Sequence, residues 1–150
     1  MDKLKKILVP IDGSSNSLRA LSNAIFLAKM AGASITGIFV VHSESETDTF
    51  LEYLEPLSGL DEKGFVGKQL SEANVMMGEA IEECQKNNVI FNGIVAQGNP
   101  GVKIVKYSED KDFDIIVIGI TGKGRTSEVL LGSVSYDVTH KAKLPVMLVK

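Results

Sequence analysis

The sequence predicts an α/β domain in which helices cover both faces of a parallel sheet. Stretches typical of buried strands alternate along the chain with stretches whose apolar residues recur every three or four positions. The length of 150 residues is typical of a single domain. No internal repeat, linker or low-complexity segment divides the chain. Residues 1–150 are therefore expected to form one domain.

Composition narrows the class of protein further. Hydrophobic residues make up 44% and charged residues 23%, which is ordinary for a soluble globular protein. No apolar run approaches the roughly 20 residues that cross a bilayer, and the N-terminus lacks the features of a signal peptide. The single cysteine, Cys84, excludes an intrachain disulfide. We expect a cytoplasmic protein without a membrane partner, and the net charge of −3 argues against nucleic acid.

The first strand and helix are marked by their ends. Residues 7–11 form an apolar run that reads as a buried strand. Ser14 or Ser15 can cap the helix that follows, and Gly32 is placed to end it. Residues 34–41 then predict the second strand.

The segment 43–66 shows neither strand nor helix periodicity and is unusually long for a loop. Seven acidic residues between Glu44 and Glu62 have only Lys63 as a neighbouring counter-charge. We expect a solvated, variable acidic loop.

The second half of the chain continues the alternation of helices and strands. An apolar stripe that includes Cys84 indicates a helix whose inner face packs in the core, so this thiol is expected to be structural. The predicted elements are a helix over 70–84, strands over 90–96 and 113–119, helices over 100–107 and 133–142, and a last strand over 144–149.

A glycine-rich turn follows the strand that ends at Gly119. Gly122 comes three residues after Gly119, and Gly132 and Ser133 then open the last helix. Glycines let backbone amides approach phosphate oxygens, and the amino end of a helix favours an anion. The turn also lies at the carboxyl end of a parallel strand, where ligands of open α/β sheets bind. A phosphate site is one reading, and a plain turn whose Ser133 caps a helix is the other.

Side chains around this turn add groups suited to phosphate. Ser133 and Ser135 carry hydroxyls, and Lys123 and Arg125 bring positive charge. A P-loop is excluded, because its Gly-x-x-x-x-Gly-Lys-Ser/Thr spacing does not occur.

The whole chain, from residue 3 to 150, resembles the universal stress protein family. The family pattern is Gly, two residues, Gly, nine residues, then Gly followed by Ser or Thr. It is met by Gly119, Gly122, Gly132 and Ser133. The segments 6–14 and 144–149 resemble the family's first strand with its turn and its last strand.

The resemblance implies a Rossmann-like fold of the adenine nucleotide alpha hydrolase-like type. Its five parallel strands have the order 3-2-1-4-5, which brings Asp12 and Gly119 into one crevice. It also implies ATP as the ligand, with Mg²⁺ or Mn²⁺ held mainly by the phosphates rather than by protein metal ligands. The implied nucleotide contacts are Pro10, Ile11, Asp12 and Val41 near the adenine, and Gly119, Gly122, Lys123, Gly124, Gly132, Ser133, Val134 and Ser135 along the ribose and phosphates. Arg125 is added to the predicted contacts for its positive charge in the same turn.

Two residues depart from the family pattern. Ile120 stands where a small or hydroxylated residue is common, and Thr121 where His or Arg is common. Ile120 removes a side-chain donor but keeps its backbone amide.

No catalytic residue is predicted. Asp12 could act as a metal ligand or a base, but an aspartate after the first strand more often caps a turn. His42, at the end of the second strand, could approach a nucleotide, and His140 is assigned no chemistry. We expect at most slow ATP hydrolysis.

The function implied is that of a nucleotide-responsive regulatory or stress-tolerance factor with an unidentified downstream protein. The resemblance further implies a homodimer formed by antiparallel pairing of the last strands, 144–149. A weak ATP hydrolase and a nucleotide-independent dimeric interaction protein remain the alternatives.

Overall fold

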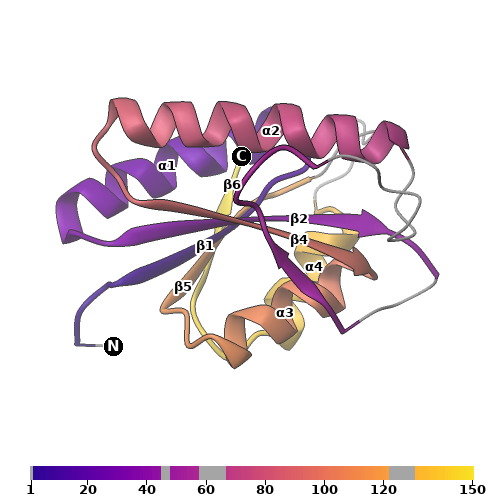
Figure 1. The fold of residues 1–150 in the computed structure, drawn as a ribbon. Helices are drawn as coiled ribbons and strands as arrows, with labels where there is room; N and C mark the ends of the chain where they lie inside the picture. The colour runs from indigo at the N-terminus through magenta and orange to yellow at the C-terminus, as the bar shows by residue number, and fades with distance from the viewer. Residues whose placement is uncertain (1, 45–47, 58–66, 122–130) are drawn as a thin grey trace.

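A computed structural model describes residues 2–44, 48–57, 67–121 and 131–150 (Figure 1). Strands and helices alternate through most of the chain, as the sequence predicts. In order, the elements are β1 (Lys6–Pro10), α1 (Ser15–Ala31), β2 (Ser34–His42), β3 (Phe50–Glu52), α2 (Gly67–Lys86), β4 (Phe91–Gly98), α3 (Pro100–Asp110), β5 (Ile115–Gly119), α4 (Ser133–Lys141) and β6 (Val146–Val149).

The strands form one sheet in the order β3-β4-β2-β1-β5-β6. Within it, β4, β2, β1, β5 and β6 pair in parallel, which confirms the predicted arrangement of five strands. The sixth strand, β3, corrects the expectation that segment 43–66 has no regular structure. It pairs antiparallel with β4, with Phe50 opposite Ala96 and Glu52 opposite Ile94.

Each face of the sheet has its own core. The helices α1 and α2 lie together on one face, and α3 and α4 cover the other (Figure 1). The alternation of side chains along β1 shows the division, because Ile7 and Val9 pack with α1 and α2 whereas Leu8 packs toward α3 and α4. Cys84 is fully buried in the core between the sheet and the helices α1 and α2.

Local hydrogen bonds fix where the first helix begins and ends. The Ser14 side chain accepts a hydrogen bond from the Ser17 N–H, so Ser14 is the cap. At the other end, Gly32 adopts a left-handed conformation with φ of 71°, and its N–H donates to the Ala28 carbonyl. Within the described part of the chain, no helix is long and apolar enough to cross a membrane.

The position of β1 creates a switch point in the sheet. The helix after β1 leads to β2 on one side, whereas β5 pairs with β1 on the other side. Pairing between β1 and β2 ends at Pro10 opposite Ile38, so β2 continues beyond the end of its neighbour. A crevice at this point is where open α/β sheets bind ligands.

Candidate functional site

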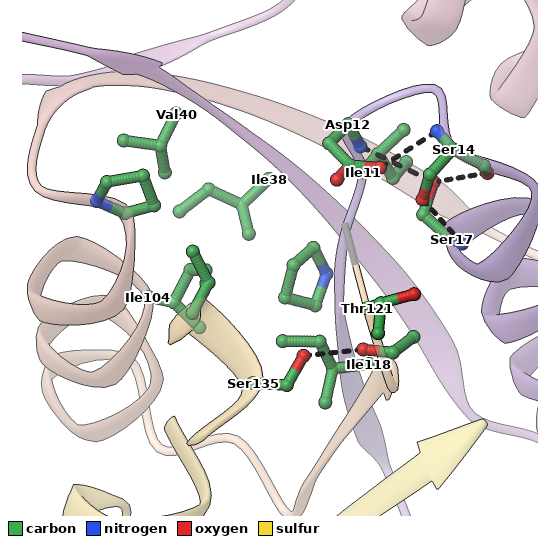
Figure 2. A pocket seen from close by; sticks show the side chains of 14 residues that line it. Ile11, Asp12, Ser14, Ser17, Ile38, Val40, Ile104, Ile118, Thr121 and Ser135 are labelled. Carbon is green, nitrogen blue, oxygen red and sulfur yellow. Dashed lines mark hydrogen bonds between the residues drawn. The ribbon is translucent and has the colours of Figure 1, made fainter. Parts of the chain in front are cut away.

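A cavity of about 140 Å³ lies at the carboxyl ends of β1, β2 and β5 (Figure 2). Ligand pockets typically measure roughly 300–1,000 Å³, so this cavity suits one planar ring rather than a whole nucleotide. A larger ligand would have to extend past the rim. The residues that line it are Pro10, Ile11, Asp12, Ser14, Ser17, Ile38, Val40, Pro100, Ile104, Ile118, Gly119, Thr121, Val134 and Ser135.

One side of the cavity is apolar. Ile38 and Val40 come from β2, Ile104 from α3 and Val134 from α4. Figure 2 shows Ile38, Val40 and Ile104 on the side opposite Asp12, Ser14 and Ser17. Branched aliphatic side chains give a flat aromatic ring a surface to pack on, and they leave its polar edge to be bound by other groups.

The opposite side is a polar turn between β1 and α1. The Asp12 carboxylate accepts a hydrogen bond from the Ser14 N–H at 2.9 Å, and the Asp12 N–H donates to the Ser17 hydroxyl oxygen at 3.4 Å. The Ser17 hydroxyl in turn donates to the Ser14 carbonyl at 3.1 Å. These bonds hold Asp12 as a turn-capping residue with its carboxyl group at the cavity wall.

The glycine-rich turn begins and ends beside this cavity. The Ser135 hydroxyl donates to the Gly119 carbonyl at 2.6 Å, and the Gly132 N–H donates to the Ile120 carbonyl at 2.8 Å. Gly132 caps α4 without a side-chain hydrogen bond. The amino end of α4, with its partial positive charge, therefore lies against the end of β5.

Gly119 itself is required by close packing. A Cβ atom at this position would lie 2.8 Å from the carbonyl carbon of Asn16 and 3.0 Å from its oxygen. The absence of a side chain lets the start of α1 approach the end of β5.

Thr121, two residues after Gly119, contacts the same part of α1. The Asn16 amide nitrogen donates to the Thr121 hydroxyl oxygen at 2.6 Å. Thr121 departs from the family pattern, yet it lines the cavity. The pairing could not be read from the chain, because 105 residues separate the two.

The structure places Val40, and not Val41, at the cavity. The Val41 side chain is 2% exposed and packs in the core beneath α1 and α2, whereas Val40 points to the opposite face of the sheet. Backbone groups alternate as well. The Ile38 carbonyl accepts a hydrogen bond from the Ile11 N–H, so it faces β1. The N–H and carbonyl of Val40, two residues further along β2, face the same direction. At the level of Val40, however, β1 has already ended.

The remaining predicted contacts divide into three groups. Pro10, Ile11, Asp12, Gly119, Val134 and Ser135 line the cavity. Gly132 caps α4 and the exposed Ser133 begins it, and neither lines the cavity. Gly122, Lys123, Gly124 and Arg125 lie outside the described residues. The cavity residues that sequence reasoning missed are Ser14, Ser17, Ile38, Val40, Pro100, Ile104, Ile118 and Thr121.

The two histidines lie away from the cavity lining. His42 is exposed at the end of β2, and His140 stacks on Tyr136 with ring centroids 5.7 Å apart. Burial raises the pKa of Tyr53, Cys84 and Tyr107, and none of these three lines the cavity. Over the described ranges, no cluster of three His, Cys, Asp or Glu side chains could hold a metal ion.

Comparison with known proteins gives one consistent result. The model of the "Universal stress protein family" matches residues 3–150. The universal stress protein MJ0531 of Methanocaldococcus jannaschii is 34% identical over 153 residues, which cover 97% of this chain and 82% of that protein.

Solved structures agree on the fold. The structure of the M. jannaschii protein MJ0577 has a TM-score of 0.79 at 28% identity and covers 97% of this chain and 95% of its own. A universal stress protein from Archaeoglobus fulgidus, in complex with dAMP, has a TM-score of 0.69 at 21% identity and full coverage of both chains. At that identity the second likeness shows the fold alone.

Proposed function

The chain belongs to the universal stress protein family, and on that premise we propose that it binds ATP at the switch point between β1 and β5. The observation that carries the proposal is one cavity that joins an apolar slot to the amino end of α4. An aromatic base and an anionic phosphate chain need these two environments side by side. A fold relative solved with dAMP indicates that this architecture can hold an adenine nucleotide.

We place the adenine in the slot between Ile38, Val40 and Ile104. The backbone N–H and carbonyl of Val40 face the space beyond the end of β1, where they can bond the polar edge of the base. The slot is too small for a ribose and phosphates as well, so these extend toward Gly119 and the start of α4.

The phosphates then lie at the glycine-rich turn. The amides of the first turn of α4, from Ser133 to Ser135, point along the helix axis toward an incoming anion. The family resemblance implies that Gly122, Lys123 and Gly124 complete this cradle, and Arg125 adds a positive charge to the same turn. A divalent cation would take its oxygen ligands mainly from the phosphates, with the Asp12 carboxylate as the neighbouring protein oxygen.

The same geometry favours a regulator over an enzyme. Among the described residues that line the cavity, Asp12 is the only titratable side chain, and one of its oxygens already accepts the Ser14 N–H. A group committed to its own turn is a poor base for activating water. We therefore propose a cytoplasmic, nucleotide-responsive stress-tolerance factor with slow or no hydrolysis.

Mass spectrometry of nucleotide released from the purified, denatured protein tests the ligand, and steady-state turnover tests the role. Bound adenine nucleotide with no turnover supports the regulator. Hydrolysis well above that of a Gly132-substituted protein favours the weak hydrolase. Purification without nucleotide, together with no affinity for added ATP, favours a nucleotide-independent interaction protein.

An edge strand supports the dimer that belongs to this proposal. The carbonyls of Pro145 and Val149 accept hydrogen bonds from Ile116 of β5 and from Ile120, the residue after β5. The backbone groups of Val146 and Leu148 therefore face away from the sheet. Leu148 is 37% exposed. An apolar edge with outward-facing donors and acceptors can pair with the same strand of a second chain.

A further inference from the structure

The seam between α1 and α2 forms a groove on the face of the sheet away from α3 and α4. The two helices lie side by side there (Figure 1). Two cavities of about 390 and 400 Å³ follow the seam, and both are lined by Leu18, Met76 and Glu79. They therefore form one continuous depression, which we call the α1–α2 groove.

The floor of the α1–α2 groove is apolar. Ile11, Leu21, Met76 and Ala80 are buried at its base. On its rims, Leu18 of α1 is 45% exposed and Val75 of α2 is 60% exposed. Covering these exposed side chains would remove apolar surface from water, which favours the binding of a partner.

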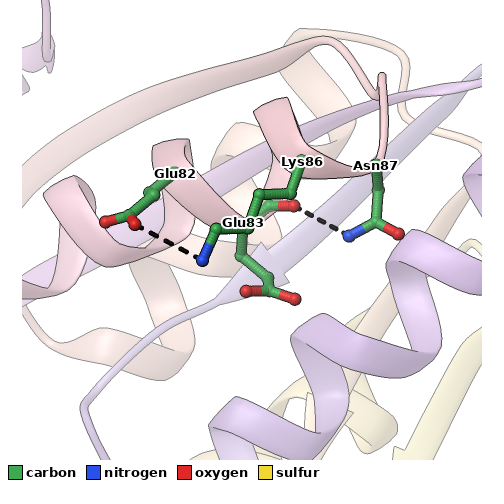
Figure 3. A network of polar contacts seen from close by, with 4 residues as sticks. All are labelled: Glu82, Glu83, Lys86 and Asn87. Atoms are coloured by element: carbon green, nitrogen blue, oxygen red, sulfur yellow. Dashed lines mark hydrogen bonds and ion pairs between the residues drawn. The ribbon is translucent and has the colours of Figure 1, made fainter.

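The α2 wall of the groove is acidic. Glu79, Glu82 and Glu83 line it, and the cation among its lining residues is Lys86, paired with Glu82 at 3.4 Å (Figure 3). Figure 3 also shows the Glu83 carboxylate on the side of α2 that faces α1. The facing stretch of α1 supplies Leu18, Leu21 and Ser22, which carry no charge. The wall therefore has an excess of negative charge beside an apolar floor.

We propose that the α1–α2 groove docks a basic amphipathic helix of a partner protein. A helix laid along the seam would place its apolar face on Leu18, Met76 and Val75, as in other helix-in-groove complexes. Lysines or arginines flanking that face would meet Glu79 and Glu83.

Other occupants find no complementary charge at the same surface. In a symmetric dimer through this face, the acidic wall of one copy would meet either the acidic wall or the uncharged α1 side of the other, so neither arrangement pairs its charge. Anionic lipid headgroups and nucleic acid phosphates would likewise be repelled by Glu79, Glu82 and Glu83. The proposal does not depend on nucleotide binding, so either can fail without the other.

The test uses the full chain and a labelled 16-residue peptide with leucines at helical spacing flanked by lysines. Its counterpart keeps the leucines and replaces every lysine with glutamate. By fluorescence anisotropy at low salt, we expect the lysine peptide to bind and the glutamate peptide to bind at least about tenfold more weakly. Amide chemical shifts should change at Leu18, Ser22, Glu79 and Glu83.

Two variants locate the site by charge and by packing. Glu79→Lys combined with Glu83→Lys should weaken binding of the lysine peptide about tenfold, because it reverses the charge of the acidic wall. Leu18→Asp should also weaken binding about tenfold, because it removes apolar contact. A control with the same change in charge, Glu109→Lys with Asp110→Lys, lies on α3 on the opposite face and should leave the affinity unchanged.

Three outcomes would overturn the proposal. The first is that the lysine peptide fails to bind the native chain. The second is that the groove variants, folded by circular dichroism, keep the native affinity. The third is that the peptide changes amide chemical shifts mainly in the acidic segment 44–62 instead of along the groove.

Discussion

The Ser135 hydroxyl donates a hydrogen bond of 2.6 Å to the Gly119 carbonyl, across 16 residues of chain. Ser135 is 3% exposed, so this bond forms out of contact with water. It ties the first turn of α4 to the last residue of β5. The two ends of the glycine-rich motif are thereby held beside each other and beside the cavity.

Replacing Ser135 with alanine should lower the free energy of unfolding by about 1–3 kcal/mol, because the Gly119 carbonyl loses its buried donor. Urea denaturation measures the change. Ser22→Ala, on the exposed face of α1, provides the control and should shift stability by less than about 0.5 kcal/mol. Equal effects of the two substitutions would show that the Ser135 bond contributes nothing.

Gly119→Ala should destabilise the fold by about 1–3 kcal/mol, because the new Cβ would lie 2.8 Å from the backbone of Asn16. Gly78→Ala is the matched control. A Cβ at this exposed helical glycine meets nothing within 4 Å, and we expect a gain of about 0.5–1 kcal/mol. The midpoints of thermal and urea unfolding should therefore fall for Gly119→Ala and rise for Gly78→Ala. A neutral Gly119→Ala would contradict the close approach of α1 to β5.

Two effects raise the pKa of the Cys84 thiol from 9.0 to about 11. Burial of the thiol is the larger effect, and the neighbouring negative charge of Glu83 is the smaller one. The native protein should therefore react slowly with iodoacetamide at pH 8, and the unfolded chain rapidly. Below pH 9 the thiol is neutral in both states, so its contribution to the free energy of unfolding is fully present. As the pH rises from 9 toward 11, the unfolded chain loses the thiol proton before the native protein does, and this contribution is lost.

Cys84→Ala isolates this contribution. The difference in unfolding free energy between native and variant protein should shrink as pH rises from 9 to 11. A difference that stays constant over this range would contradict the buried neutral thiol.

Leu148→Pro should weaken the dimer that we propose, because it removes an N–H that faces away from the sheet while sparing the bonds to β5. Leu148→Ala shortens the side chain in the same way but keeps the N–H, so it separates backbone pairing from side-chain contact. Light scattering after size-exclusion chromatography should show a loss of dimer for the proline variant that exceeds the loss for alanine. A dimer unaffected by proline would place the interface elsewhere.

The order of the parallel strands could be predicted, whereas β3 could not. Each parallel strand is a continuous apolar run between helices, and a family resemblance supplied their order. In contrast, β3 has three residues and is defined by its antiparallel pairing with Ala96, Val95 and Ile94 of β4. Such pairing depends on contacts more than 40 residues away in the chain, which no local pattern reports.

The same limit explains Val40 and Val41. From Ile38 to Val41 every residue is apolar, because both faces of β2 are covered. Without alternation, the sequence does not indicate which valine faces which side. The glycine motif is predictable from the sequence, because Gly119 and Gly132 stand at the spacing of the family pattern. The structure holds both residues at the two ends of one turn.

We propose that an adenine nucleotide binds across the Ile38–Val40 slot and the amino end of α4. Isothermal titration of ATP with Mg²⁺ into native and Gly132→Val protein tests it most directly. Gly132 has φ of −68°, which valine adopts without strain, so the variant should fold while its side chain crowds the phosphates. We expect saturable binding to the native protein and no heat of binding to the variant. Unchanged affinity in a folded Gly132→Val protein would contradict this site.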